Sequence, residues 1–236
     1  MYAVTHAIAR PPSFFRGFTA EALAPLAAAA SWRSFEPGQM VLEGGDPSRE
    51  VFFVAEGMVR VLGRTSGGHE LILNELRPGE LFGEYAAIDG EPRSAAVVAL
   101  ARSRLCALPS APFMAFVLST PGAALQLLRL LTARVRERDA RLIELVALPV
   151  RLRLASLLLR LSRPRTGGGG RVISPPPPHH ELAARIGTRR EVVSRILSQM
   201  QREALLTADR RAMVLPQPEA LEAAVEAGFQ QAAGGG

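Results

Sequence analysis

The sequence predicts an α+β fold in which a β-rich first part is followed by one long helix and a helical last part. Three observations lead to this prediction. Short apolar runs separated by Pro and Gly turn signals fill residues 31–108. An apolar repeat with alternating spacings of three and four begins after Pro121. The formal net charge of +6 is confined to the last part of the chain.

The first part is expected to form an antiparallel jelly-roll β-barrel. Many short strands that alternate with turn signals are typical of such barrels. A helix capped by Thr19 is predicted before them, since Thr is a favoured N-cap residue. The clearest strand candidates are Val51–Val54, Met58–Leu62, Leu71–Leu76 and Ala95–Leu100.

A long helix is predicted to begin at Pro121, because proline is favoured in the first turn of a helix. Its apolar repeat is the seam of a coiled coil, along which two copies of the chain would pair. Arg138 interrupts the seam and Asp139 follows it, so the seam either uses a polar residue to fix its register or faces a ligand there. The seam positions are Leu128, Leu131, Val135, Arg138, Leu142 and Leu145.

The helix is expected to end at a hinge, Leu148-Pro149. A second helix is predicted over about Val150–Leu161. Residues 163–178 are rich in Gly and Pro and are predicted to be a loop. Residues 230–236 are predicted to be disordered.

Residues 82–95 place a carboxylate and a guanidinium near the two ends of a short segment bounded by Gly and Pro. Glu84 can accept a hydrogen bond from a ribose hydroxyl, and Arg93 can bind phosphate oxygens with two N–H groups at once. A helical turn over Tyr85–Ile88 would direct further N–H groups at the phosphate. The alternative is an ordinary surface turn. The candidate ligand-binding residues here are Gly83, Glu84, Tyr85, Ala86, Arg93, Ser94 and Ala95.

Residues 180–203 have the pattern of a helix-turn-helix. One short apolar face precedes Gly187, which allows a tight turn, and a second apolar stripe follows it. Arg190 and Arg195 can bind guanine, and Glu191 can accept from cytosine. The alternative for Glu191 is a capping box with Thr188.

A hairpin wing is predicted around residues 205–215, where two arginines would contact phosphates. The candidate DNA-binding residues of this part of the chain are Arg189, Arg190, Glu191, Ser194, Arg195, Arg210 and Arg211.

The composition excludes several classes of protein. Cys106 is the only cysteine, which excludes an intrachain disulfide and a four-cysteine metal site. No leader and no apolar run of membrane-spanning length is evident, so a cytoplasmic protein without a membrane partner is expected. All 28 basic residues are arginine. Residues 1–146 contain 15 Arg and 15 acidic residues, whereas residues 147–236 contain 13 and 7. This asymmetry favours a neutral sensor joined to a nucleic-acid binder.

The string Gly-Glu, Ala, Gly-x-Pro-Arg-Ser-Ala within residues 83–95 resembles the phosphate-binding cassette of cyclic-nucleotide-binding domains. With Gly187 and the Arg190-Glu191-x-x-x-Arg195 signature, residues 20–216 resemble the cyclic-AMP receptor protein/FNR family of bacterial transcription regulators. The resemblance implies an allosteric homodimer that binds a palindrome in double-stranded DNA and contacts RNA polymerase, without metal or catalysis. It also implies a cyclic-nucleotide-binding domain (1–120), a dimerisation helix (121–148) and a winged helix-turn-helix domain (149–236).

Alignment on the family places Arg138 and Asp139 where hydroxyl side chains contact the base. Arg only donates and ionised Asp only accepts, which suits the O6, N1–H and N2–H₂ edge of guanine. Ser94 could also reach a guanine amino group. The sequence therefore predicts a slight preference for cyclic GMP over cyclic AMP. The alternative is an ion pair, within or between subunits, that never meets the base.

Two rival functions fit the sequence less well. A regulatory module of a cyclic-nucleotide-controlled enzyme lacks room for a catalytic domain and shows no nucleophile–base pair. A regulator that has lost its ligand is disfavoured by the intact Glu84 and Arg93.

Overall fold

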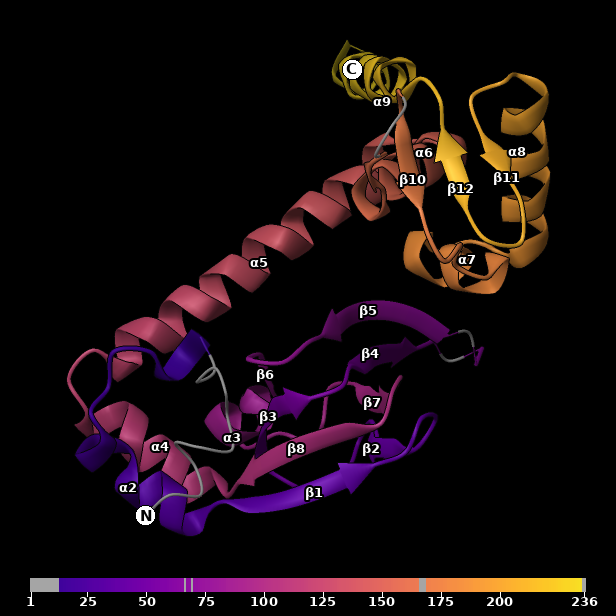
Figure 1. Cartoon of the computed structure of the whole chain (residues 1–236). Helices are drawn as coiled ribbons and strands as arrows, with labels where there is room; N and C mark the ends of the chain where they lie inside the picture. Colours follow the sequence, from indigo (N-terminus) through magenta and orange to yellow (C-terminus); the bar gives the residue numbers. More distant parts are fainter. Residues whose placement is uncertain (1–12, 66, 69, 166–168, 235–236) are drawn as a thin grey trace. The chain divides into compact units, whose positions relative to one another are not determined.

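The computed structural model describes residues 13–65, 67–68, 70–165 and 169–234 (Figure 1). The chain divides into two compact units, residues 1–134 and 135–236. The division falls inside the long helix α5 (Ala123–Ala147). Each unit has its own hydrophobic core.

The first unit contains two four-stranded antiparallel sheets among its described residues, as a jelly-roll barrel requires. This confirms the predicted β-domain and its four strand candidates. One sheet has the order β1-β8-β3-β6 and the other the order β2-β7-β4-β5. The strands of the first sheet are β1 (Ser31–Phe35), β8 (Ser103–Leu108), β3 (Val51–Glu56) and β6 (Leu81–Phe82). Those of the second are β2 (Met40–Leu42), β7 (Ala96–Ala99), β4 (Val59–Arg64) and β5 (Glu70–Leu76).

Strand β3 lies at the centre of the first core. Successive side chains of a strand point to opposite faces. Phe52 and Val54 accordingly join the apolar cluster that contains residues of both sheets. Val51 and Phe53 join a second cluster with residues of the helices. Burial on both faces explains why β3 reads as a continuous apolar run rather than an alternating one.

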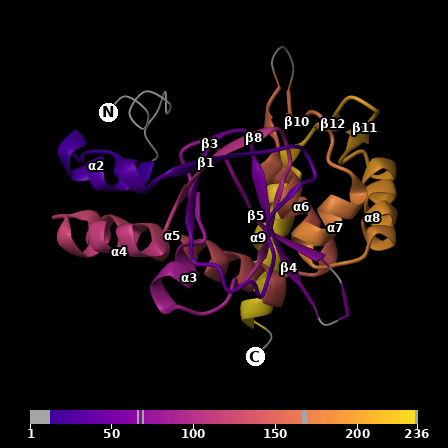
Figure 2. The same ribbon diagram turned by 90° about the horizontal axis from the view of Figure 1, so that it is seen from below.

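Helices cover one face of the first sheet. Besides the short turn η1 (Ser13–Phe15), these are α2 (Ala20–Ala29) and α4 (Ser110–Ser119), which lie side by side in Figures 1 and 2. Thr19 caps α2 as predicted, its hydroxyl accepting from the Ala22 N–H at 3.2 Å. A further short helix, α3 (Glu84–Asp89), follows β6.

The prediction that the long helix begins at Pro121 is wrong by two residues. Thr120, Pro121 and Gly122 instead form a turn, closed by the Ala123 N–H and the Thr120 carbonyl at 3.1 Å. The helix therefore starts at Ala123, after the glycine.

The second unit begins with the rest of α5 and continues through a helix-turn-helix and a small sheet. The predicted helix at 150–161 is confirmed as α6 (Val150–Leu161). The helix-turn-helix is α7 (His179–Ile186) and α8 (Arg190–Arg202), which lie together in Figures 1 and 2. Its core contains fully buried leucine, valine and methionine side chains, among them Leu154, Leu158, Leu182, Val193 and Met200.

Two predictions for this unit are wrong. Residues 163–178, expected as a loop, contain strands β9 (Arg163–Pro164) and β10 (Arg171–Ile173), although residues 166–168 lie outside the described ones. The predicted wing is the hairpin of β11 (Thr207–Ala208) and β12 (Met213–Leu215). Strand β10 pairs with β12, so the hairpin becomes part of a four-stranded sheet with the order β11-β12-β10-β9.

The expected disorder of residues 230–236 is contradicted up to Gly234, the last residue of α9 (Pro218–Gly234). Residues 235–236 lie outside the described part of the chain. Helix α9 is fixed by packing against α6, with Leu221 buried. A Cβ built on Gly228 would lie 2.5 Å from Leu152 Cδ1, which shows how closely the two helices approach.

Among the described residues, no single helix has the length and apolarity needed to cross a bilayer. Helices α4 and α5 meet that requirement only when taken together, and they are bent by 109° at the break between them.

Gly57 and Gly38 provide a matched test of how tightly the barrel is packed. Their φ angles are +85° and +83°, where residues other than glycine are strained. A Cβ on Gly57 would lie 2.3 Å from Ser103 Oγ and 2.4 Å from the Arg102 carbonyl, whereas nothing lies within 4 Å at Gly38. Gly57→Ala should therefore destabilise the protein by more than about 2 kcal/mol, and Gly38→Ala by only about 1 kcal/mol. Urea unfolding measures both; equal costs would contradict the packing described.

Candidate functional site

Arg93 is buried, with 5% of its surface exposed, and its guanidinium is held by three acceptors of the first unit. Nε donates to Ser48 Oγ at 3.1 Å, Nη1 to the Gly83 carbonyl at 2.9 Å and Nη2 to the Glu50 carbonyl at 2.8 Å. A guanidinium has five N–H donors. Three of the five N–H groups of Arg93 are thus paired with described residues, and two remain for a ligand. Two N–H groups are the number that binds a phosphate in bidentate fashion.

The loop before β3 fixes the backbone of Arg93 as well. The Gly45 N–H donates to the Arg93 carbonyl at 2.8 Å, and the Arg93 N–H donates to the Asp46 carbonyl at 2.9 Å. Asp46 Oδ1 accepts from the Ser48 N–H at 2.7 Å, and its hydrogen bonds to Ser48 lower the pKa of Asp46. Burial lowers the pKa of Arg93, while the charges of Asp46, Glu50 and Glu84 oppose that shift. Arginine nevertheless stays protonated in proteins.

Glu84, the first residue of α3, is only 2% exposed. The residue before it must be glycine: at φ +82°, a Cβ on Gly83 would lie 2.8 Å from Arg93 Nη1 and 2.8 Å from the Glu50 carbonyl. Glu84 Oε1 accepts from Arg134 Nη1, and Arg134 Nη2 donates to the Leu81 carbonyl. The buried carboxylate is thus neutralised by an arginine of α5.

Arg134 was not predicted from the sequence. It precedes Val135, so it lies just beside the apolar seam on which the prediction concentrated. One signal was available: Arg134 stands four residues before Arg138, the spacing that places two side chains on one face of a helix.

The other predicted ligand-binding residues are distributed around this centre. Ala86 is buried in α3, Tyr85 and Ala95 are half-buried, and Ser94 is exposed. Arg138 and Asp139 are exposed on the part of α5 that belongs to the second unit. The structure thus brings Gly83, Glu84 and Arg93 together, while contact of Arg138 and Asp139 with a base stays a prediction.

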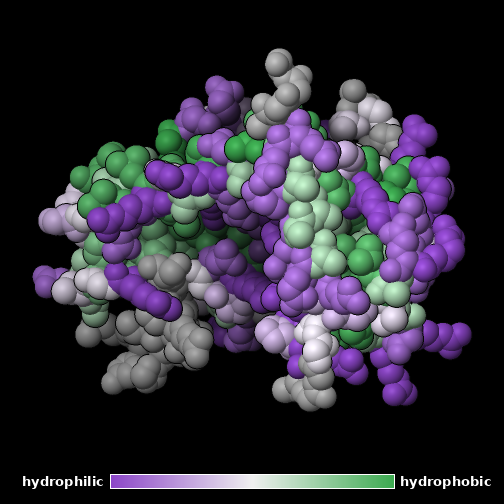
Figure 3. Space-filling view, turned by 90° about the horizontal axis from the view of Figure 1, so that it is seen from above, coloured by the Kyte–Doolittle hydropathy of each residue, from purple (hydrophilic) through white to green (hydrophobic). Residues whose placement is uncertain are grey.

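The predicted DNA-reading face lies on α8. Helix α8 begins at Arg190 after the N-cap residue Arg189, and no side chain caps it. The alternative in which Thr188 and Glu191 form a capping box is therefore wrong. Arg190, Glu191 and Arg195 are exposed, and hydrophilic residues cover the right-hand edge of Figure 3, where Figure 1 places α8. The opposite face of α8 is buried through Val193, Ile196, Leu197 and Met200, as predicted.

Two further features adjoin this face. Ser194 Oγ lies 2.8 Å from Nδ1 of His179, the first residue of α7. In the turn of the wing, Asp209 Oδ1 accepts from the N–H groups of Arg211 at 2.6 Å and Ala212 at 2.9 Å. These bonds lower the pKa of Asp209. The turn leaves the side chains of Arg210 and Arg211 exposed.

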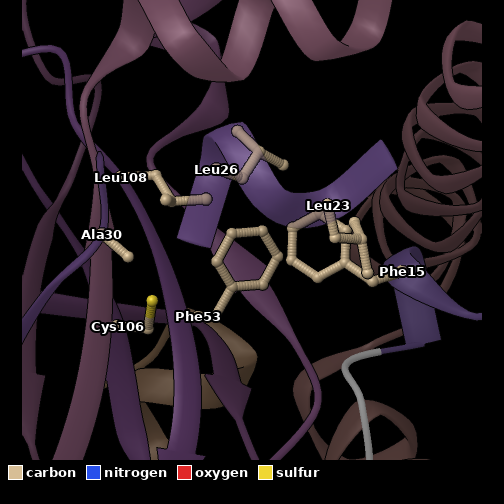
Figure 4. A pocket seen from close by; sticks show the side chains of 7 residues that line it. All are labelled: Phe15, Leu23, Leu26, Ala30, Phe53, Cys106 and Leu108. Atoms are coloured by element: carbon tan, nitrogen blue, oxygen red, sulfur yellow. The ribbon is translucent and has the colours of Figure 1, made fainter. Parts of the chain in front are cut away.

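A small apolar cavity of about 30 Å³ lies between α2 and the first sheet (Figure 4). It has room for about one water molecule and has no polar lining, so it stays dry and cannot hold a nucleotide. Within the described residues, no group of three or more His, Cys, Asp or Glu side chains is arranged to bind a metal. The cavity is lined by Phe15, Leu23, Leu26, Ala30, Phe53, Cys106 and Leu108.

Comparison with known proteins agrees with this geometry. Residues 32–120 match the family model of the cyclic nucleotide-binding domain, and residues 152–224 match the Crp-like helix-turn-helix domain. The chain is 36% identical over 174 residues to the cyclic AMP receptor protein of Thermus thermophilus, covering 74% of this chain and 78% of that protein. It is 25% identical over 210 residues to a CRP-like cAMP-activated global transcriptional regulator of Mycobacterium tuberculosis, covering 88% and 93%.

Among solved structures, a transcriptional regulator of the CRP/FNR family from Thermus thermophilus matches with a TM-score of 0.67 at 28% identity, covering 83% of this chain and 98% of that one. The fold and the two matched domains define a cyclic-nucleotide-binding, DNA-binding transcription regulator, not an enzyme. The chain belongs to the cyclic-AMP receptor protein/FNR family.

The environment of Cys106 predicts an unreactive thiol. Burial raises the pKa of Cys106 to about 11, and only the thiolate is a nucleophile. At pH 8 the folded protein should therefore react with a disulfide reagent at least about a hundredfold more slowly than the protein in urea. Absorbance of the released thiol measures both rates. Equal rates would show that the cavity beside Cys106 opens freely to solvent.

Proposed function

We propose that a cyclic nucleotide binds the first unit through Arg93 and Glu84 and thereby controls DNA binding by α8. The observation that supports this most is the buried guanidinium of Arg93, with three N–H groups fixed and two remaining. Such a group is aligned before the ligand arrives, so little entropy is lost when it binds a phosphate. Ser94, exposed next to it, offers one more donor.

Glu84 is proposed to bind the ribose. Its Oε1 is occupied by Arg134, and no hydrogen bond to Oε2 occurs among the described residues. Oε2 can therefore accept from a ribose hydroxyl while Oε1 stays paired with Arg134. In this proposal Arg134 is a third residue of the site, and it belongs to α5 rather than to the barrel.

Cyclic AMP is proposed as the principal ligand. Both curated relatives described above are named for cyclic AMP. The slight preference for cyclic GMP, expected from Arg138 and Asp139, has no support from these relatives. If these two residues face the base, they offer Asp139 as an acceptor for the amino group of adenine.

A homodimer along α5 is proposed because its seam is uncovered in the single chain. Leu128, Val135 and Leu142 are 60%, 53% and 59% exposed, although leucine and valine are among the residues most often buried. A second copy would bury them, and seam pairing by α5 would set two DNA-binding units at a fixed separation. In this proposal residues 1–120 bind the nucleotide, residues 121–148 form the dimer, and residues 149–236 bind DNA.

Two α8 helices in such a dimer would enter successive major grooves about 34 Å apart and read a palindrome. Arg190, Glu191 and Arg195 would contact bases, and Arg189, Arg210 and Arg211 would contact phosphates. Contact with RNA polymerase and a cytoplasmic location follow from this role and are part of the proposal.

Titration calorimetry with cyclic AMP and cyclic GMP tests the ligand site. Wild-type protein should bind cyclic AMP more tightly. Arg93→Lys should weaken both ligands by about 10- to 100-fold, because lysine cannot donate two parallel hydrogen bonds to a phosphate. Arg102→Lys, at a barrel position that is 81% exposed, is the matched control and should change nothing.

Two results would contradict the proposal. If Arg93→Lys binds both nucleotides as tightly as wild type, Arg93 does not bind the phosphate. Tighter binding of cyclic GMP that is lost in Asp139→Ala would overturn the choice of cyclic AMP.

A further inference from the structure

A hydrogen bond joins the two helices of the helix-turn-helix at their DNA-facing end. His179 is the first residue of α7, and its Nδ1 lies 2.8 Å from the hydroxyl of Ser194 in α8. Both side chains are half-buried. His179 and His180 are neighbours in the sequence, and no metal-binding group includes them in the described part of the chain.

Ser194 belongs to the same face of α8 as the residues proposed to read DNA. It follows Arg190 by four positions and Glu191 by three, which are the spacings of neighbours on one face of a helix. Arg195 is adjacent to it. The direction of the Ser194 O–H bond therefore affects what this face offers to DNA.

Whether Nδ1 of the imidazole carries a hydrogen decides that direction. A hydroxyl has one donor and two acceptor lone pairs, and a neutral imidazole donates through one nitrogen and accepts through the other. If Nδ1 accepts, the Ser194 hydroxyl donates its only hydrogen to His179 and can only accept hydrogen bonds from other groups. If Nδ1 is protonated, as it always is in the imidazolium, it donates to Ser194, and the Ser194 hydrogen is available to another group.

We propose that His179 is a positioning residue that sets the hydrogen-bonding polarity of Ser194 toward DNA. This inference rests on the proposed contact of α8 with the operator. Phosphate oxygens and the major-groove atoms guanine N7 and O6, adenine N7 and thymine O4 are all acceptors. With Nδ1 the acceptor in the neutral ring, the change to imidazolium makes Ser194 a donor to them, so operator binding should tighten when the ring gains a proton as the pH falls.

Other ionisable groups lie on each helix that packs around the pair. Helix α6 contributes Arg153, whose Nη1 donates to the Ile186 carbonyl at the other end of α7. The remaining groups are His180, Glu181 and Arg185 on α7, Arg190, Glu191, Arg195 and Arg202 on α8, and Arg151 and Arg160 on α6. Of these side-chain types, only histidine ordinarily changes charge between pH 5 and 8. His180, which is exposed, is therefore the competing group that a control must remove.

The test measures fluorescence anisotropy of a duplex selected by the wild-type protein from random sequence, with cyclic AMP present, at pH 6 and pH 8. Wild type and the control His180→Asn should bind about fivefold more tightly at pH 6, the effect of roughly one hydrogen bond. In His179→Asn the side-chain amide reaches the position of Nδ1 but does not titrate, so binding should persist without pH dependence. Ser194→Ala should bind more weakly and also lose the pH dependence.

Circular dichroism at both pH values establishes that each variant is folded. A pH dependence retained in His179→Asn or in Ser194→Ala would overturn the inference. Arg190→Ala separates this outcome from failure of the proposed function. If Arg190→Ala binds the duplex as tightly as wild type, α8 does not read the operator; if it binds weakly while the His179 variants keep the pH dependence, only the role of His179 is wrong.

Discussion

The buried guanidinium of Arg93, with its three fixed hydrogen bonds, is the interaction on which the proposed ligand site depends. A buried cation is unfavourable unless its donors are paired, and the barrel supplies three acceptors from two segments: Ser48 and Glu50 before β3, and Gly83 before α3. Glycine at position 83 is required because any Cβ would meet the guanidinium. The loop before β3 and the start of α3 thus hold the guanidinium of Arg93 in place, and two of its N–H groups remain available.

Helix α5 connects this site to the rest of the molecule. At its middle it supplies Arg134 to Glu84, and along its length it bears the exposed apolar seam before the helix ends ahead of Leu148-Pro149. A ligand can shift a conformational equilibrium only through a difference in its affinity for the two states. Because Arg134 shares the carboxylate proposed to bind ribose, the geometry of α5 near Glu84 is where such a difference can arise.

The sequence predicts which residues lie together where they are close in the chain, and it misses pairs that are distant. Glu84 and Arg93 stand nine residues apart in one segment, and Arg190 to Arg195 lie in one helix, so spacing was sufficient to group them, while their binding roles stay predictions. Arg134 is fifty residues from Glu84, and their meeting depends on where α5 lies against α3. Strand β10 was missed because its Gly- and Pro-rich flanks resemble a loop and its partner, β12, follows some forty residues later. The bond between His179 and Ser194 depends in the same way on the crossing of two helices.

Cyclic nucleotide at Arg93 and Glu84 is proposed to control DNA binding by α8. The most direct test is the affinity of the wild-type protein for its selected operator duplex, measured at fixed salt with and without saturating cyclic AMP, because protein–DNA affinity depends steeply on salt. If the two sites are coupled, cyclic AMP should tighten binding by at least about tenfold, which is within the usual range for allosteric proteins. Equal affinity in the two conditions would contradict the coupling.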